Sequence, residues 1–179
     1  GVGCTVTFFA LHAIGRIPAM LNFTSGALNL IAACRAAGVK RILTARKFVE
    51  QGRLEELVEA LGKEIEITYL EDVREKIGLT DKLAALVKTR APGRFAAKAE
   101  PDDTAVILFT SGSFGTPRGA LLSHANLVGN VEQAWAHINF DPSWVFFNPL
   151  PMFHCFGLTA GTLLPLFTGL KALLYPSPL

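Results

Sequence analysis

Charged side chains are scarce at both ends of this sequence. Of its 32 charged residues, only Arg16 and Arg35 precede Lys40, and only four follow Asp103. A free-standing domain carries polar groups over most of its surface. We therefore expect the two apolar ends to be inner layers of something larger, and residues 1–179 to be one part of a domain.

A strong excess of either charge is also absent. The net charge is +2, and charged residues make up 18% of the sequence. A disordered tail would be more polar, and a nucleic-acid-binding arm would be more basic. The composition therefore indicates a folded chain with no nucleic-acid partner.

Cysteines are few, and long apolar runs are interrupted. Cys4, Cys34 and Cys155 form no C-x-x-C pair, which argues against a disulfide scaffold or a structural zinc site and favours a reducing compartment such as the cytoplasm. The longest proline-free piece of the uncharged tail, from Met152 to Leu164, has 13 residues. As a helix it would extend about 20 Å, whereas a bilayer core needs about 30 Å. Buried structure is therefore favoured over a transmembrane span.

Short apolar strands alternate with segments of helical periodicity, which predicts a layered α/β fold with mostly parallel sheets and flanking helices. The expected strands are residues 17–23, 39–44, 64–70, 105–109 and 120–122. Five helices are expected. The first is a buried helix over residues 1–14, the second begins at a cap by Thr24 or Ser25 and ends at Gly38, and the third covers residues 48–61. The fourth is a short helix capped by Thr80 with Asp81 at its positive end, and the fifth covers residues 126–138 and is capped by Ser123.

Two of these helices are expected to bury apolar residues that recur at helical spacing. They are Leu28, Ile31 and Ala32 in the second helix, and Val128, Val131, Trp135 and Ile138 in the last. Residues 91–103 show no periodicity. We expect them to be a surface linker between the charged first half and the apolar second half.

A loop rich in glycine and hydroxyl side chains follows the strand 105–109. It reads TSGSFGTPRG from Thr110 to Gly119. Glycines permit backbone conformations in which successive N–H groups form a concave anion site. Arg118 is the only lysine or arginine between Thr104 and Leu170. A lone guanidinium in such a loop favours phosphate binding, although an ordinary long hairpin turn would have a similar composition.

Spacing excludes two other phosphate-binding motifs. A Walker A loop reads G-x-x-x-x-G-K-[ST], but Pro117 stands five residues after Gly112, and Ala120 stands five after Gly115. The dinucleotide fingerprint G-x-G-x-x-G is absent as well.

The loop resembles the signature TSG-S-[TE]-G-x-P-K-G of the acyl-adenylate-forming, or AMP-binding, superfamily of acyl-CoA synthetases, acyl-carrier-protein synthetases, luciferases and peptide-synthetase adenylation domains. Two later segments, ALLSHANLVGN at 120–130 and NPLPMFHCFGLTAGTLLPLFTGLKALLYPSPL at 148–179, resemble the motifs that follow in this superfamily. Two earlier ones, IPAMLNFTSGALNLIAACRAAGVKRILTARKFVEQ and YLEDVREKIGLTDKL, are most similar to one branch. That branch is the bifunctional 2-acylglycerophosphoethanolamine acyltransferase/acyl-[acyl-carrier-protein] synthetase.

The resemblance implies the front part of the large N-terminal domain of an adenylate-forming enzyme. It implies that the loop wraps the β- and γ-phosphates of ATP, with Mg²⁺, while a fatty acid carboxylate attacks the α-phosphorus. Acyl-AMP and pyrophosphate would result. The acyl group would pass to acyl carrier protein for lysophospholipid reacylation or, alternatively, to coenzyme A. The implied ATP-binding residues are Thr110, Ser111, Gly112, Ser113, Gly115, Thr116, Arg118 and Gly119, and the implied acyl-binding residues are Phe153 and His154.

Two residues depart from the signature. Phe114 stands where the superfamily has Thr or, in that branch, Glu, and a phenyl ring cannot hydrogen-bond phosphate. Arg118 replaces Lys and keeps the positive charge on a larger, planar group. The Phe114 departure leaves open a non-catalytic acyl- or nucleotide-binding remnant of the family.

His154 has a second interpretation, as a hydrogen-bonded histidine packed under a loop. Its neighbour Cys155 is expected to be a small packed residue, because adjacent side chains on an extended chain point apart and do not form a catalytic pair.

The superfamily's G-Y-G-x-T-E segment and carboxy-terminal lysine, and the branch's acyltransferase motif H-x-x-x-x-D, do not occur in this sequence. We therefore expect residues 1–179 alone to be inactive. The full-length protein is expected in the cytoplasm or, because that branch is membrane-associated, on the cytoplasmic face of the inner membrane. A peripheral membrane protein held by its apolar ends is the remaining alternative.

Overall fold

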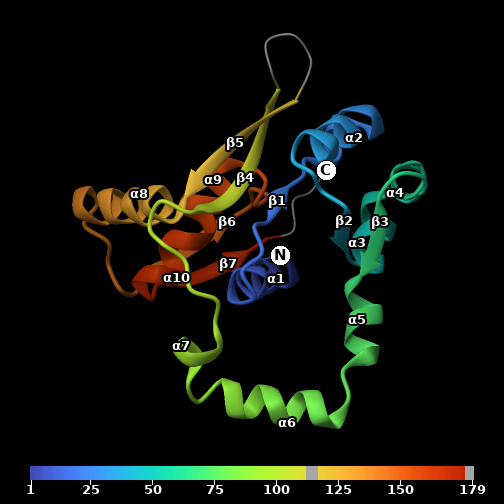
Figure 1. Ribbon diagram of the computed structural model, residues 1–179. Coiled ribbons are helices and arrows are strands. Elements are labelled where there is room, and N and C mark those ends of the chain that lie inside the picture. The colour runs from blue at the N-terminus through green and yellow to red at the C-terminus, as the bar shows by residue number, and fades with distance from the viewer. Residues whose placement is uncertain (112–116, 176–179) are drawn as a thin grey trace. The chain divides into compact units, whose positions relative to one another are not determined.

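The computed structural model describes residues 1–111 and 117–175 of the chain (Figure 1). These residues form two compact units, each of which is described by itself. Unit 1 consists of Gly1–Asn22, Ala97–Thr110 and Gly119–Leu179, and unit 2 consists of Phe23–Ala96 and Ser111–Arg118.

Unit 1 is built on two small sheets, one of three strands in the order β1–β4–β5 and one that pairs β6 with β7. The strands are β1 Ala19–Met20, β4 Thr104–Ser111, β5 Pro117–Ser123, β6 Val145–Asn148 and β7 Lys171–Leu174. The last residue of β4 and the first two of β5 belong to unit 2. β1 runs parallel to β4, and β6 runs parallel to β7. Parallel neighbours of this kind need a long crossover connection, which the intervening helices supply.

Helices pack on these strands and complete the core of unit 1. They are α1 Val2–Ala13, α8 His124–His137, α9 Cys155–Leu158, the π-helix η2 Thr159–Leu163 and α10 Leu164–Thr168. The continuous segment α9–η2–α10 packs against both the β6–β7 pair and α8. The buried core residues are Phe8, Ala105, Val106, Leu108, Leu127, Val131, Met152, Leu158, Leu163 and Leu164.

Unit 2 contains one pair of parallel strands, β2 Arg41–Thr44 and β3 Glu66–Tyr69. Its helices are η1 Phe23–Ser25, α2 Ala27–Ala36, α3 Arg46–Gly52, α4 Glu55–Gly62, α5 Leu70–Lys76, α6 Leu79–Lys88 and α7 Pro92–Phe95. α4 packs against α2 and β3, and α5 also packs against β3. The layered α/β fold with parallel sheets and flanking helices is therefore confirmed. α7 lies inside the segment 91–103 that was expected to be a linker.

Three details of the helices in unit 2 differ from the prediction. Neither Thr24 nor Ser25 caps α2, because the cap position is Gly26, whose φ of 82° only glycine adopts readily. The expected helix over 48–61 is two helices, because Arg53 with φ 51° ends α3 in the left-handed region. Thr80 is inside α6, and the carboxylate of Asp81 instead accepts a bond of 2.9 Å from the N–H of Gly78.

The buried faces of three helices were also wrongly predicted. α2 buries Leu30, Ala33 and Cys34 and leaves Leu28 exposed. The buried residues have the same spacing as the predicted ones but lie on a different side of the helix. α1 buries only Thr5 and Phe8. α8 buries Val131, as predicted, and also Leu127, which was not predicted, whereas three residues expected to point inward are exposed: Val128, Trp135 and Ile138.

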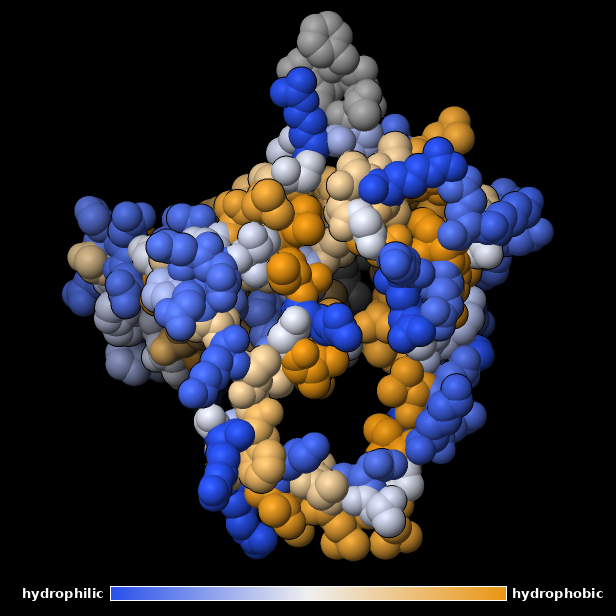
Figure 2. Space-filling view, in the orientation of Figure 1, coloured by the Kyte–Doolittle hydropathy of each residue, from blue (hydrophilic) through white to orange (hydrophobic). Residues whose placement is uncertain are grey.

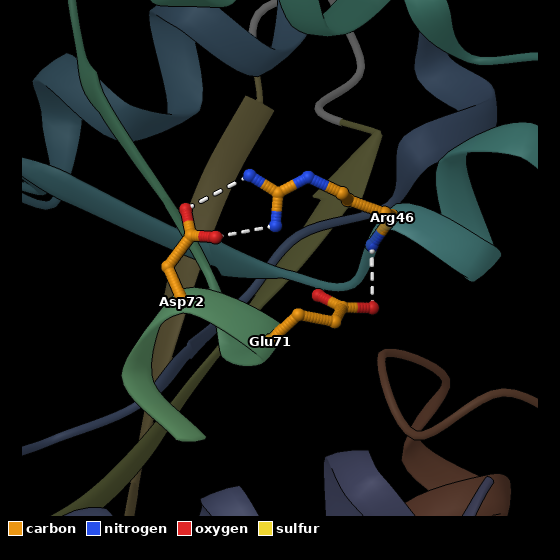
Figure 3. Close-up of polar contacts among 3 residues, drawn as sticks. All are labelled: Arg46, Glu71 and Asp72. Carbon is orange, nitrogen blue, oxygen red and sulfur yellow. Dashed lines mark hydrogen bonds and ion pairs between the residues drawn. The ribbon is translucent and has the colours of Figure 1, made fainter. Parts of the chain in front are cut away.

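A cluster of charged side chains joins the carboxyl ends of β2 and β3 (Figure 3). The guanidinium of Arg46, the first residue of α3, donates to both carboxylate oxygens of Asp72 at 2.5 and 2.9 Å, and it also lies 4.3 Å above the Tyr69 ring. The carboxylate of Glu71 accepts a bond of 2.9 Å from the backbone N–H of Arg46. These contacts fix the start of α5 against the start of α3.

Replacing Asp72 by asparagine should destabilise unit 2 at neutral pH and have little effect in acid. Hydrogen bonds from Arg46 hold the pKa of Asp72 below its ordinary value of 3.8, with Lys76 adding a smaller attraction. A carboxyl with a lowered pKa in the folded state stabilises that state above its unfolded pKa, and the contribution is lost as the pH falls through the folded pKa. The measurement is hydrogen exchange of the amides in residues 41–76 for both proteins at neutral and acid pH. Glu56→Gln, an exposed change in the same unit, is the control, and an equal loss at both pH values would contradict the prediction.

In residues 1–111 and 117–175, no helix is long and apolar enough to cross a membrane.

Candidate functional site

The strands β4 and β5 frame the glycine-rich loop. β4 is the central strand of its sheet and buries Ala105, Val106 and Leu108, and β5 is its neighbour. Five of the loop residues lie outside the described part of the chain: Gly112, Ser113, Phe114, Gly115 and Thr116. Their contacts with phosphate stay a prediction from the sequence.

The ends of the loop are described. Thr110 is exposed near the end of β4, Ser111 is the last residue of that strand, and Arg118 is exposed in β5. Among the described residues, Arg118 forms no salt bridge, whereas Arg35, Arg41 and Arg46 each pair with a carboxylate. The guanidinium of Arg118 is therefore available to an anion.

Gly119 serves packing in a way the sequence did not suggest. It is one of the residues that the resemblance implies for ATP binding; it lies within β5 and is not among the positive-φ glycines of the described chain. A Cβ at this position would lie 3.1 Å from Cγ2 of Ile107 and 3.6 Å from Cε1 of Phe109. Gly119 is thus the residue that lets β4 side chains pack across β5.

The N-terminus of α8 follows β5 directly, but its backbone donors are already used. The hydroxyl of Ser123 accepts from the N–H of Asn126 at 3.2 Å, which confirms the predicted cap. The N–H groups of His124 and Ala125 donate to the carbonyls of Asp103 and Pro101 at 3.1 and 2.8 Å. This helix end therefore has no free donors in its first turn for a phosphate.

The turn that carries Phe153 and His154 is held from behind by a buried amide. Asn148, at the end of β6, is 5% exposed, and its Oδ1 accepts from the N–H of Leu150 at 3.0 Å. Its Nδ2 lies 3.3 Å from the carbonyl of Gly157 and 3.4 Å from Oγ1 of Thr162. The Thr162 hydroxyl donates to the same carbonyl at 2.8 Å.

Two glycines allow this arrangement. A Cβ on Gly161, in the π-helix η2, would overlap the side-chain amide of Asn148, and a Cβ on Gly157 would overlap the carbonyl of Pro151. π-Helical turns are uncommon and occur often at functional sites. Sequence reasoning missed Asn148, Gly157, Gly161 and Thr162, although the spaced glycines of FGLTAG were a usable signal of close packing.

His154 is exposed and caps α9. Its Nδ1 accepts from the N–H of Phe156 at 3.3 Å, and its carbonyl accepts from the N–H of Leu158 at 2.9 Å. Phe153 is half-buried. Cys155 is exposed, contrary to the expectation of a packed residue. The structure fixes the backbone of this turn, and the acyl-binding roles of Phe153 and His154 stay predictions.

The described residues contain neither a disulfide nor a cluster of metal-ligand side chains. All three cysteines are free, and burial raises the pKa of the Cys34 thiol. A thiol with a raised pKa is a poor nucleophile at neutral pH. Residues 1–111 and 117–175 contain no group of three or more His, Cys, Asp or Glu side chains that could hold a metal ion.

Comparison with known proteins places the whole chain in one family. Residues 1–179 match the family described as AMP-binding enzyme. The medium-chain-fatty-acid–[acyl-carrier-protein] ligase TtuA of Teredinibacter turnerae is 40% identical over 72 residues, which are 40% of this chain and 11% of that protein. Acyl-CoA ligase sidI of Beauveria bassiana is 27% identical over 175 residues, which are 95% of this chain and 30% of that protein.

Solved structures share the fold. The o-succinylbenzoate CoA synthetase MenE of Bacillus subtilis, in complex with its acyl-adenylate intermediate, superposes with a TM-score of 0.76 at 15% identity over 100% of this chain and 42% of its own. ATP-bound MatB of Rhodopseudomonas palustris superposes with a TM-score of 0.70 at 24% identity over 99% of this chain and 34% of its own. The chain thus spans less than half the length of each of these four proteins.

Proposed function

This chain belongs to the AMP-binding enzyme family, and from that premise we propose that the protein is a ligase that activates a fatty acid with ATP and transfers the acyl group to acyl carrier protein. The relatives named above include ligases of both the acyl-carrier-protein and the coenzyme A type, which supports acyl activation as the common chemistry. Reacylation of a lysophospholipid is the proposed use of the product and rests on the sequence motifs of the bifunctional branch.

The proposed reaction has two steps. A carboxylate oxygen of the fatty acid attacks the α-phosphorus of ATP, the bond from that phosphorus to the bridging oxygen breaks, and pyrophosphate leaves. The thiolate of the carrier then attacks the acyl carbon, and AMP leaves with its phosphate oxygen. The protein's task in the first step is to hold a polyphosphate whose leaving group gains negative charge.

The observation that carries the proposal is the position of Arg118. It is exposed on β5, at the carboxyl end of the loop, and forms no salt bridge with any described residue. A guanidinium without a carboxylate partner suits the developing charge of pyrophosphate, and Thr110 is exposed near the opposite end of the loop. Because the loop resembles the superfamily signature, we also include the hydroxyls and glycines of the loop in the proposed ATP site.

Mg²⁺ is proposed to be bound together with ATP. Mg²⁺ keeps several waters and is commonly held by one or two carboxylates together with substrate phosphates. When bound, the ion would neutralise part of the phosphate charge.

The proposal is tested by fatty-acid-dependent exchange of radiolabelled pyrophosphate into ATP, catalysed by the full-length protein. We expect exchange with a fatty acid present and none without it. We also expect thioester formation to be faster with acyl carrier protein than with coenzyme A. Faster thioester formation with coenzyme A would instead assign an acyl-CoA ligase. Residues 1–179 on their own are expected to catalyse neither step.

A non-catalytic remnant of the family is the second candidate, because Phe114 replaces a residue that can hydrogen-bond phosphate. If the protein is a remnant, exchange will be absent from the wild type and restored by Phe114→Thr or Phe114→Glu. If the wild type already exchanges as fast as these variants, the remnant hypothesis fails.

A further inference from the structure

The helix α6 has an apolar face that the other described residues of unit 2 leave uncovered. Leu79, Leu83, Leu86 and Val87 recur at the spacing of one helical face, and their exposed fractions are 79, 59, 54 and 59%. α4 is a matched amphipathic helix in the same unit, but its apolar face packs on β3 and α2, and its Leu61 is 4% exposed. An apolar face at helical spacing is therefore buried in α4 but left exposed in α6, and the exposure of α6 needs an explanation of its own.

The segment around α6 is strongly basic. We call residues 73–96 the amphipathic arm; every residue in it is exposed. It carries six basic and two acidic residues, a net charge of +4 in a chain whose total is +2. The basic residues are Arg74, Lys76, Lys82, Lys88, Arg90 and Arg94. Within the described part of the chain none of them forms a salt bridge.

Apolar and basic residues lie side by side along this arm. Figure 2 shows an apolar strip over α6, at the lower edge of the view, with hydrophilic residues beside it. Lys82 borders the apolar face on the helix, so its ammonium can reach headgroups while its methylene chain covers apolar surface. α7 adds Phe95, which is 50% exposed. The root of the arm is fixed, because Arg46 holds Asp72 and Glu71 at the start of α5.

We propose that the amphipathic arm binds the surface of a bilayer that contains anionic phospholipids. A short helix with aliphatic residues on one face and lysine and arginine around it is the pattern that lies in the plane of such an interface. The apolar face enters the headgroup–acyl boundary, and the cations meet lipid phosphates. The charge of the arm favours an anionic surface over a neutral one. The proposal is independent of the proposed ligase activity.

The test is flotation of the full-length protein, without ATP or fatty acid, with vesicles of equal parts phosphatidylglycerol and phosphatidylcholine and with vesicles of phosphatidylcholine alone. We expect binding to the anionic vesicles, weaker binding to the neutral ones, and loss of the difference at high salt. Lys88→Gln with Arg90→Gln should weaken binding to anionic vesicles about 30-fold, at roughly a tenfold change per 1.4 kcal/mol and about 1 kcal/mol per cation. Lys40→Gln with Lys63→Gln, exposed in the same unit but outside the arm, should leave it unchanged.

The contribution of the apolar face to vesicle binding is tested by a separate variant. Leu83→Gln with Leu86→Gln should weaken binding to both kinds of vesicle by about 10-fold or more, because two exposed leucines no longer enter the interface. Leu28→Gln, an exposed leucine on α2, is the matched control. Both pairs of arm residues are exposed, so circular dichroism should show the fold intact. Wild-type levels of vesicle binding in the arm variants would overturn the proposal. Binding of an acidic protein such as acyl carrier protein through the arm, with no binding to either vesicle, would overturn it as well.

Discussion

Replacing Gly161 by alanine is expected to lower the free energy of unfolding of unit 1 by about 3 kcal/mol or more. The added methyl group would overlap the side-chain amide of Asn148. That amide is buried and bonded to three groups, so it cannot move aside without leaving polar atoms unpaired. The measurement is urea unfolding followed by the fluorescence of Trp135 and Trp144, both of which lie in unit 1.

Gly129→Ala is the matched control for this change. Gly129 lies in α8, and a Cβ there would meet nothing within 4 Å. Alanine in a helix interior is favoured over glycine by roughly 0.5–1 kcal/mol, so this variant should be slightly more stable than the wild type. If both alanine variants had the same stability, the overlap with Asn148 would not be the cause.

A double mutant separates the clash from other effects of Gly161→Ala. Asn148→Ala removes the amide that the new methyl group would meet, at the cost of the hydrogen bonds to Leu150 and Gly157. The two changes together should therefore destabilise unit 1 by less than the sum of the single changes. Additive losses would place the effect of Gly161→Ala elsewhere in η2.

The sequence predicted elements whose signals are local and unambiguous. The apolar run of β4 specifies a buried central strand, and Ser123 with Asn126 specifies the start of α8, because the cap needs only neighbouring residues. The cap of α2 was missed because Thr24 and Ser25 offer the same side-chain signal. Only the fold shows that Gly26, with its positive φ, takes the cap position instead.

The other wrong or missed predictions share one physical reason: tertiary contacts decide among conformations that the local sequence allows equally well. Leu28 and Leu30 both fit a helical apolar period, and the packing of α2 on α4 selects Leu30. Arg53 gives no sign in the sequence that it adopts a left-handed conformation. Asn148 stands before Pro149 as an ordinary turn residue, and its partners Gly157 and Thr162 are 9 and 14 residues away.

The candidate site likewise has some residues with a local sequence signal and others that only tertiary contacts reveal. The loop and its cation could be proposed as a phosphate site because glycines, hydroxyls and a lone Arg118 are visible in the sequence. The support for the turn of Phe153 and His154 was not found, because it depends on the buried amide of Asn148. A site residue that binds a ligand is often recognisable by type, whereas a residue that positions the backbone is recognised only by its contacts.

Replacing Arg118 by alanine is expected to slow fatty-acid-dependent ATP–pyrophosphate exchange by the full-length protein about 100- to 1,000-fold in kcat/KM. The reason is the loss of the guanidinium that would meet the charge developing on pyrophosphate. Arg118→Lys keeps the charge but loses the planar pair of donors, so it should retain more activity than the alanine variant. Because the arginine is exposed and forms no salt bridge with a described residue, stability should change by less than about 0.5 kcal/mol.

That separation of activity from stability makes Arg118 a direct test of the phosphate loop. Arg16→Ala removes another exposed arginine of the chain and should leave exchange unchanged. If Arg118→Ala exchanged as fast as the wild type, the cation would have no part in holding pyrophosphate. The loop would then keep only its hydroxyls and backbone donors as a proposed ATP site. A large loss with Arg118→Ala and a smaller one with Arg118→Lys would instead place a positive charge beside the leaving group, as the proposed reaction requires.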